Sequence, residues 1–402
     1  MLRDDVAFCL SVKVVGDPIG GDKYKPSDKP IDGDGDGLCF EGRVDRKPVP
    51  CPPGIGIGSV RVERDGGRRS VWDLPGEKPA ITPWRTLAKK HRDRILKKVE
   101  SLGLTKRAVK AQSKKIFAQA TPEMRESART WYPRLSDLLE NFAEEVQEKY
   151  GVNLSFETVV GVTASLSSAR EFVANVRATR RLVQVWAEDA EFDPSVDNLD
   201  EEKAPVLQEI IAAVRKTGRT RLKPSDFSDD QLDTLIYAHP LLAGGPEGTS
   251  IVNTTGTPPV RAALAMLRGA SVDEQLTGPK RRSFYSNIVD PNGDKVTVDR
   301  HQYRAMVNPR TILNTGQWTG TLKQWEAKEK SPQDMFQTSP GGKEVGENLG
   351  VYPWFAEIVR EIAEQEGLPP SAVQAIMWEV QRTSDGAKLT DWSKVEEAIR
   401  LA

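Results

Sequence analysis

The sequence has 402 residues, of which 38% are apolar and 29% charged, and its net charge is −1. This composition is typical of a globular protein of two or three domains, and no stretch reaches the roughly 20 apolar residues that a membrane-spanning helix requires. We therefore expect no membrane partner, and the charges close to the start of the chain argue against a signal peptide. Three cysteines exclude a four-cysteine iron–sulfur cluster and form no disulfide framework.

Residues 1–83 are rich in Gly, Pro and Asp and lack helical periodicity, so we expect an irregular tail. Within it, DGDGDGLCFEG (32–42) spaces Asp32, Asp34 and Asp36 two residues apart and adds Glu41. This spacing is typical of the first half of a Ca²⁺ loop, but the acid required at the twelfth position is replaced by Arg43. A Ca²⁺-binding turn and a plain acidic turn are therefore alternative interpretations.

A basic helical segment follows at residues 84–120. Between residues 84 and 115 it has 12 Lys and Arg residues and only two acidic ones. Clustered cations supply much of the affinity for the DNA backbone, so this segment is a candidate phosphate-facing surface. Its candidate contact residues are Lys89, Lys90, Lys97 and Lys98. The alternative interpretation is a solvated helix face.

From residue 121 to about 390 the sequence predicts an all-α domain, followed by a C-terminal helix at 391–402. Thr121 and Pro122 are typical of a helix start, Gly151 of a helix end, and Pro133 predicts a kink or break between them. Apolar residues at three- and four-residue steps between 131 and 146 indicate the face that enters the core. Two more helices are expected around a polar elbow at residues 165–168.

An acidic insertion is expected at about residues 187–256, where residues 187–202 have eight acidic residues and no basic one. Strand candidates are few. They are SVRVER (59–64) in the tail and the short KVTV (295–298). The predicted fold class is therefore mainly α.

The stretch from Gly278 to Met306 carries the most informative chemistry. It opens with a Gly-Pro turn before a new helix, and a helix start offers backbone N–H groups to a phosphate. Asp299 begins another helix, where it either caps that helix or is held as an acid for chemistry. We expect the turn and Asp299 to converge on one groove. The candidate DNA contacts here are Gly278, Lys280, Arg281, Arg282, Arg300 and His301.

Two kinds of side chain have both a packing and a binding interpretation. Four tryptophans lie at core-facing helix positions, but a tryptophan beside a cleft could also stack on a base: Trp131, Trp186, Trp354 and Trp378. Asn175 and Asn287 lie on otherwise apolar helices, where a buried amide could satisfy backbone groups or read a base edge.

Several segments carry a resemblance to a known family: LTGPKRRSFYSNIV (276–289), VTVDRHQYR (296–304) and VTASLSSAREFVANV (162–176). Together they resemble the helix-hairpin-helix DNA glycosylase superfamily, and more closely an uncharacterised phage protein family related to it. The resemblance implies an all-α glycosylase-like fold that binds DNA in a cleft and flips out a base. It also implies that Asp299 is the catalytic aspartate and that Gly278 contacts a phosphate. Lys280, or Arg281 in a register shifted by one residue, takes the place of the hairpin lysine.

The N-terminal region is similar to tails on phage head-morphogenesis proteins. Three functions follow as hypotheses. The first is an enzyme that excises or processes a DNA base, and the second a non-catalytic DNA-binding protein. The third is a virion-associated structural protein that contacts packaged DNA and the capsid or portal. The expected location is the host cytoplasm or the virion.

Overall fold

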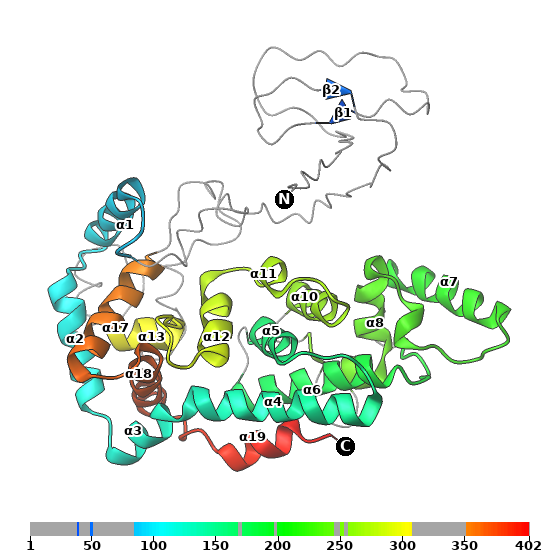
Figure 1. The fold of residues 1–402 in the computed structure, drawn as a ribbon. Coiled ribbons are helices and arrows are strands. Elements are labelled where there is room, and N and C mark those ends of the chain that lie inside the picture. Colours follow the sequence, from blue (N-terminus) through cyan, green and yellow to red (C-terminus); the bar gives the residue numbers. More distant parts are fainter. Residues whose placement is uncertain are drawn as a thin grey trace, which may run out of the picture. The chain divides into compact units, whose positions relative to one another are not determined.

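The computed structural model describes residues 38–39, 49–50, 84–167, 171–196, 199–244, 250–252, 256–307 and 351–401 (Figure 1). The chain divides into two compact units, residues 1–68 and 69–402. In the first unit, β1 (Leu38–Cys39) pairs antiparallel with β2 (Val49–Pro50). The predicted Ca²⁺ turn at Asp32, Asp34, Asp36 and Glu41, and the strand candidate 59–64, lie outside the described residues.

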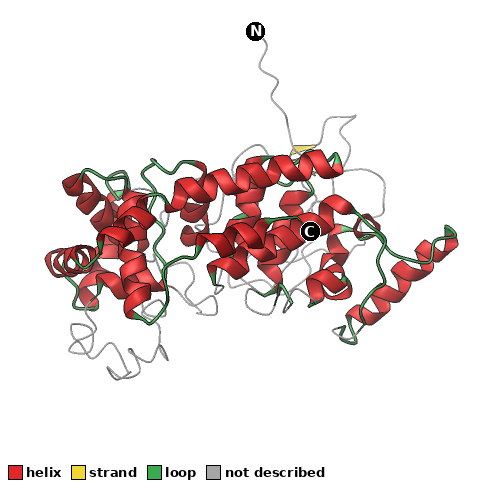
Figure 2. Cartoon of the chain, turned by 90° about the horizontal axis from the view of Figure 1, so that it is seen from below, coloured by secondary structure: helices red, strands yellow, loops and turns green. Residues whose placement is uncertain are grey.

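The second unit confirms the mainly α fold class (Figure 2). Within its described residues it has short 3-10 helices at Pro224–Asp226 and Asp229–Gln231, and none of its α-helices could span a membrane. These α-helices are α1 (Lys89–Ser101), α2 (Lys106–Ala118), α3 (Pro122–Arg129), α4 (Trp131–Tyr150), α5 (Phe156–Leu166), α6 (Phe172–Glu188), α7 (Lys203–Lys216), α8 (Leu232–Ala238), α9 (Pro240–Ala243), α10 (Thr257–Leu267), α11 (Val272–Gln275), α12 (Pro279–Val289), α13 (Arg300–Met306), α17 (Tyr352–Glu366), α18 (Pro370–Ser384) and α19 (Trp392–Ile399).

Local sequence signals set the ends of the early helices. Thr121 caps α3 by accepting a hydrogen bond from the Met124 N–H at 3.2 Å. The expected break falls at Thr130, so Pro133 lies in the first turn of α4, where its missing N–H has no intrahelical role. Gly151 ends α4 with a φ of 66°, a conformation that glycine adopts without strain.

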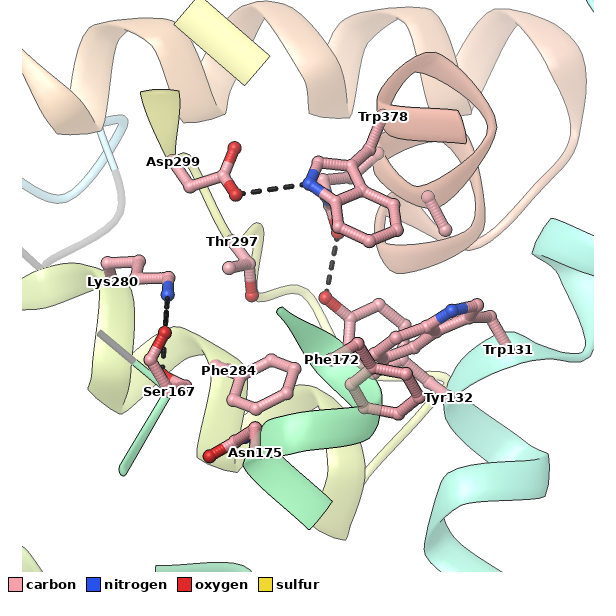
Figure 3. Close-up of a pocket in the computed structure, with 12 residues that line it drawn as sticks. Trp131, Tyr132, Ser167, Phe172, Asn175, Lys280, Phe284, Thr297, Asp299 and Trp378 are labelled. Atoms are coloured by element: carbon pink, nitrogen blue, oxygen red, sulfur yellow. Dashed lines mark hydrogen bonds between the residues drawn. The ribbon is translucent and has the colours of Figure 1, made fainter. Parts of the chain in front are cut away.

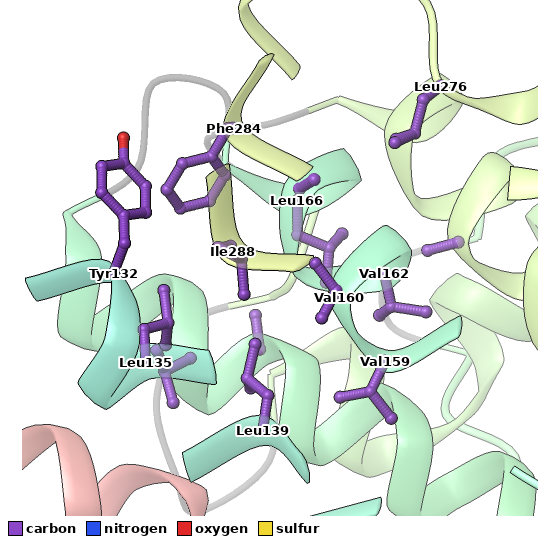
Figure 4. Packing of buried hydrophobic residues seen from close by; sticks show 14 of the residues in the cluster. Tyr132, Leu135, Leu139, Val159, Val160, Val162, Leu166, Leu276, Phe284 and Ile288 are labelled. Carbon is purple, nitrogen blue, oxygen red and sulfur yellow. The ribbon is translucent and has the colours of Figure 1, made fainter. Parts of the chain in front are cut away.

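The core is centred on α5, whose residues from Val159 to Leu166 are all buried. α5 packs against α4, α6, α10 and α12, and Figure 4 shows Leu135 and Leu139 of α4 beside Ile288 of α12. The break between α5 and α6 falls later than the predicted elbow at residues 165–168, because α5 continues through Ser165 to Leu166 and α6 begins at Phe172. This packing places the end of α5 next to the start of α12.

The basic segment belongs to the same unit as the later helices. α2 packs against α13, α17 and α18, and α19 packs against α6. Glu361 of α17 forms ion pairs with Lys106 and Lys110 of α2. Part of the basic excess therefore has an internal acidic partner.

The predicted KVTV strand is wrong. Residues 295–299 are irregular, and Val296 and Val298 are nevertheless buried. The hydroxyl of Tyr352 donates to the Val296 carbonyl at 2.7 Å and accepts from the Val298 N–H at 2.9 Å. Because a side chain satisfies these backbone groups, the segment needs no partner strand.

Candidate functional site

A pocket forms where several helices of the second unit meet, and Lys280 and Asp299 both line it (Figure 3). It encloses about 570 Å³ of empty space, part of which is open to solvent. Its other lining residues are Trp131, Tyr132, Ser167, Phe172, Asn175, Phe284, Thr297, Gln374, Ala375 and Trp378.

Asp299 caps a helix, which is one of the two roles that the sequence allowed, and it also lines the pocket. Its Oδ1 accepts from the Gln302 N–H at 2.9 Å and so caps α13. Its Oδ2 accepts from the Trp378 indole N–H at 3.0 Å. Two donors therefore fix the orientation of a half-buried carboxylate at the edge of the pocket.

Trp378 is itself held in place on α18. The guanidinium of Arg382 lies 4.4 Å from its ring centre, and His301 meets it edge-on at 6.3 Å. The position of the Asp299 carboxylate thus depends on α18, a helix almost eighty residues away in the sequence.

Lys280 belongs to α12, and its amine reaches the C-terminal end of α5. Its amine donates to the Ser167 carbonyl at 2.9 Å, and Ser167 Oγ is 3.3 Å away. The helix end favours a cation there. Burial lowers the pKa of the Lys280 amine, and Arg281 and Arg300 lower it further, whereas Asp299 acts in the opposite direction. Burial is the largest of these effects, so the amine gives up its proton more readily than an exposed lysine.

Aromatic rings form much of the remaining wall. Trp131 lies 4.5 Å from Phe172, 6.0 Å from Trp378 and 6.1 Å from Phe284, measured between ring centres. In the view of Figure 3, Trp131 and Phe172 lie across the pocket from Lys280, and Trp378 lies beside Asp299. Such a wall suits a flat, apolar-faced ligand whose polar edge meets the charged side.

Two other basic side chains predicted to contact DNA, Arg282 and His301, lie close to acidic residues of the protein. The guanidinium of Arg282 donates a hydrogen bond to the backbone carbonyl of Asp273 and lies 3.8 Å from the Asp273 carboxylate. His301 lies 3.4 Å from Asp385, a carboxylate that also pairs with Arg304 at 3.2 Å. Both side chains therefore have internal partners that the sequence did not indicate.

Gly278 begins α12 with a φ of 80°, and Arg281 donates to the Thr277 hydroxyl at 2.8 Å. Arg300 is exposed. On α1, His91, Ile95 and Val99 face inward, which leaves the four predicted lysines exposed: Lys89, Lys90, Lys97 and Lys98.

Sequence reasoning missed Gln374 and Thr297 as pocket residues. Gln374 lies on an apolar helix and Thr297 in the presumed strand, and neither has a local signal. Trp378 was recognised only as a packing residue that could stack in a cleft. Their shared location depends on how α18 packs on α13, which no local pattern encodes.

The fold and site thus define a helical protein with a pocket that combines aromatic walls, an amine and a carboxylate. A family of unknown function (DUF7178) matches residues 96–198. This range supplies Trp131, Tyr132, Ser167, Phe172 and Asn175 to the pocket, whereas Lys280 and Asp299 lie beyond it. No curated protein and no solved structure matches the chain.

Proposed function

We propose that this protein binds DNA and takes a base, rotated out of the duplex, into the pocket, with a fold of the helix-hairpin-helix glycosylase type. The observation that carries the proposal is the meeting of Lys280 and Asp299, which are 19 residues apart in the sequence, at one aromatic pocket. A base removed from the stack needs a flat apolar slot and polar groups at its edge, because it loses both stacking and pairing. The pocket offers both.

The reaction that these groups suit is cleavage of the bond between base and sugar. The carboxylate of Asp299 would stabilise the positive charge that develops on the sugar, or accept a proton from an attacking water. The amine of Lys280, once free of Ser167 and of its proton, could instead attack the sugar carbon and displace the base. Burial of the amine favours the unprotonated form that such an attack needs.

The DNA backbone would lie over the surface around the pocket. The start of α12 at Gly278 and the exposed Arg300 border the residues that line it. The exposed lysines of α1 would bind phosphates farther along the duplex. Removing one lysine that binds a phosphate should reduce the slope of log affinity against log salt by about 0.9, so Lys97→Ala with Lys98→Ala tests this surface.

An assay for abasic sites or strand cleavage tests the catalytic proposal, with phage or host DNA and duplexes that carry altered or mismatched bases. We expect Asp299→Asn to reduce the rate at least about 100-fold, as loss of an acid–base group does. Asn is as good a helix cap as Asp, so α13 should remain intact. Asp294→Asn is the matched control, because Asp294 is exposed and pairs with Lys295. Equal rates for wild type and Asp299→Asn would refute the catalytic role.

A non-catalytic DNA-binding protein is the second candidate. It is favoured by the hydrogen bonds of both groups, because the Lys280 amine already satisfies Ser167 and the Asp299 carboxylate already caps α13. In this case DNA binding should weaken in Lys280→Ala and Arg281→Ala and be unchanged in Asp299→Asn. Salt-dependent binding without any base loss in wild type would select this candidate.

A further inference from the structure

A buried acid lies behind the aromatic wall of the pocket. Glu379, on α18, is fully buried and does not line the pocket. Its Oε1 accepts from the Thr390 hydroxyl at 2.6 Å, and its Oε2 lies 3.7 Å from Nη1 of Arg382. Burying a carboxyl group costs free energy unless the group is paired, so Glu379 and these two partners hold one another in place. We call Glu379, Arg382 and Thr390 the Glu379 cluster.

The Thr390 hydroxyl joins this cluster to both tryptophans that line the pocket. It donates its hydrogen to Glu379, and it accepts from the Trp131 indole N–H at 3.4 Å and from Nη1 of Arg382 at 3.5 Å. A hydroxyl has one hydrogen and two lone pairs, so its hydrogen-bonding capacity is fully used. Trp131 is thus held directly, whereas Trp378 is held through Arg382.

Arg382 connects the cluster to the carboxylate at the pocket. It follows Trp378 by four residues on α18, a spacing that places two side chains side by side, and its guanidinium carbon lies 4.4 Å from the ring centre. A cation over the face of an indole ring is attracted to the ring and makes its N–H a stronger donor. That N–H donates to Asp299 Oδ2 at 3.0 Å (Figure 3). An unbroken series of contacts therefore links a buried acid to Asp299.

We propose that Arg382 is a positioning residue: stacked on Trp378 and anchored within the Glu379 cluster, it keeps the Trp378 N–H directed at Asp299. This inference rests on the proposed function, because it assumes that the Asp299 carboxylate takes part in base removal. The cap of α13 fixes one oxygen of that carboxylate, through the Gln302 N–H, and Trp378 fixes the other. Misplacing a catalytic group by about 1 Å can slow a reaction about 100-fold, so Arg382 affects the reaction from outside the pocket.

Hydrogen exchange at the Trp378 indole N–H, followed by NMR, tests the positioning without any reaction. Trp378→Phe assigns the signal, because it removes this indole. We expect exchange to become about tenfold faster in Arg382→Leu, since the N–H then spends more time away from Asp299. Arg134→Leu is the matched control. Arg134 also stacks on an indole, at 4.9 Å, but that indole belongs to Trp392, which does not line the pocket.

Single-turnover base loss, with protein in excess over the duplex, tests the consequence for the reaction. We expect Arg382→Leu to slow base loss about tenfold and to leave the duplex Kd within about twofold of wild type, because only the position of the carboxylate changes. Arg134→Leu should retain the wild-type rate. A weaker Kd with an unchanged rate at saturation would show that Arg382 binds a phosphate instead, and would overturn the inference.

A double variant separates positioning from damage to the fold. In Arg382→Leu the buried Glu379 loses its cation, which costs stability. Glu379→Leu with Arg382→Leu removes both charges, and replacing a buried ion pair by apolar residues is often neutral for stability. The double variant should show the same faster exchange at Trp378 and the same slower base loss.

The possible failures can be told apart. If wild type removes no base from any duplex, the proposed catalysis fails and the inference fails with it. If wild type is active but both leucine variants keep the wild-type exchange at Trp378, or the wild-type rate of base loss, only the positioning role is overturned.

Discussion

Tyr352→Phe should destabilise the segment that leads to Asp299, because the Tyr352 hydroxyl bridges two buried backbone groups. The substitution keeps the ring and removes one oxygen, which leaves the Val296 carbonyl and the Val298 N–H without their partner. A buried backbone group that loses its hydrogen bond costs about 1–3 kcal/mol, so we expect the free energy of unfolding to fall by about 2–4 kcal/mol.

Urea denaturation measures this loss, and hydrogen exchange at the Val298 amide locates it. Exchange at Val298 should become faster in Tyr352→Phe, because its N–H would no longer be bonded. Tyr150→Phe is the control, since Tyr150 is half-buried and its ring is covered by the Lys149 amine at 5.4 Å. We expect the control to lie within about 0.5 kcal/mol of wild type. An unchanged stability and unchanged Val298 exchange in Tyr352→Phe would show that packing alone holds the segment.

Three further predictions concern pH and packing. Burial lowers the pKa of His239 to about 4, so stability should fall by up to about 3 kcal/mol as pH falls from 6.5 to 4. His239→Asn keeps an acceptor for the Leu241 N–H and should flatten this dependence in urea denaturation. Burial raises the pKa of Glu379 above 4.5, so the folded state holds that proton more tightly and stability should fall as pH rises above 4.5. Glu379→Gln should reduce this fall, measured in the same way. Gly161→Ala would bring a methyl group to 2.9 Å from the Met266 sulfur, and thermal unfolding should show a net loss of about 1 kcal/mol after the gain in helix propensity.

Local chemistry in the sequence was sufficient to predict the helices and many of their ends. The Thr121 cap, the break before Pro133 and the glycine end at Gly151 each depend on contacts within a few residues. The failed strand prediction at 295–298 has the opposite origin. Alternating valines indicate burial but do not identify what satisfies the backbone, and here the partner is a tyrosine more than fifty residues away.

The sequence indicated two of the residues that line the pocket, Lys280 and Asp299, for reasons that the structure makes clear. The resemblance and the turn at Gly278 indicated Lys280 and Asp299, and each of these residues also has a structural role at the end of a helix. The role of Asp299 is local, whereas Lys280 contacts Ser167 at the end of a helix that precedes it by 113 residues. The end of α5 holds the Lys280 cation and the start of α13 holds the Asp299 anion, so the groups that stabilise these helices also face the pocket. A capping pattern therefore does not argue against a functional residue. Gln374 has no such local signal, because its place in the pocket depends on the packing of α18, where its Oε1 accepts from the hydroxyl of Tyr132 on α4. The pocket residues contributed by α18 are thus ones that only the tertiary structure reveals.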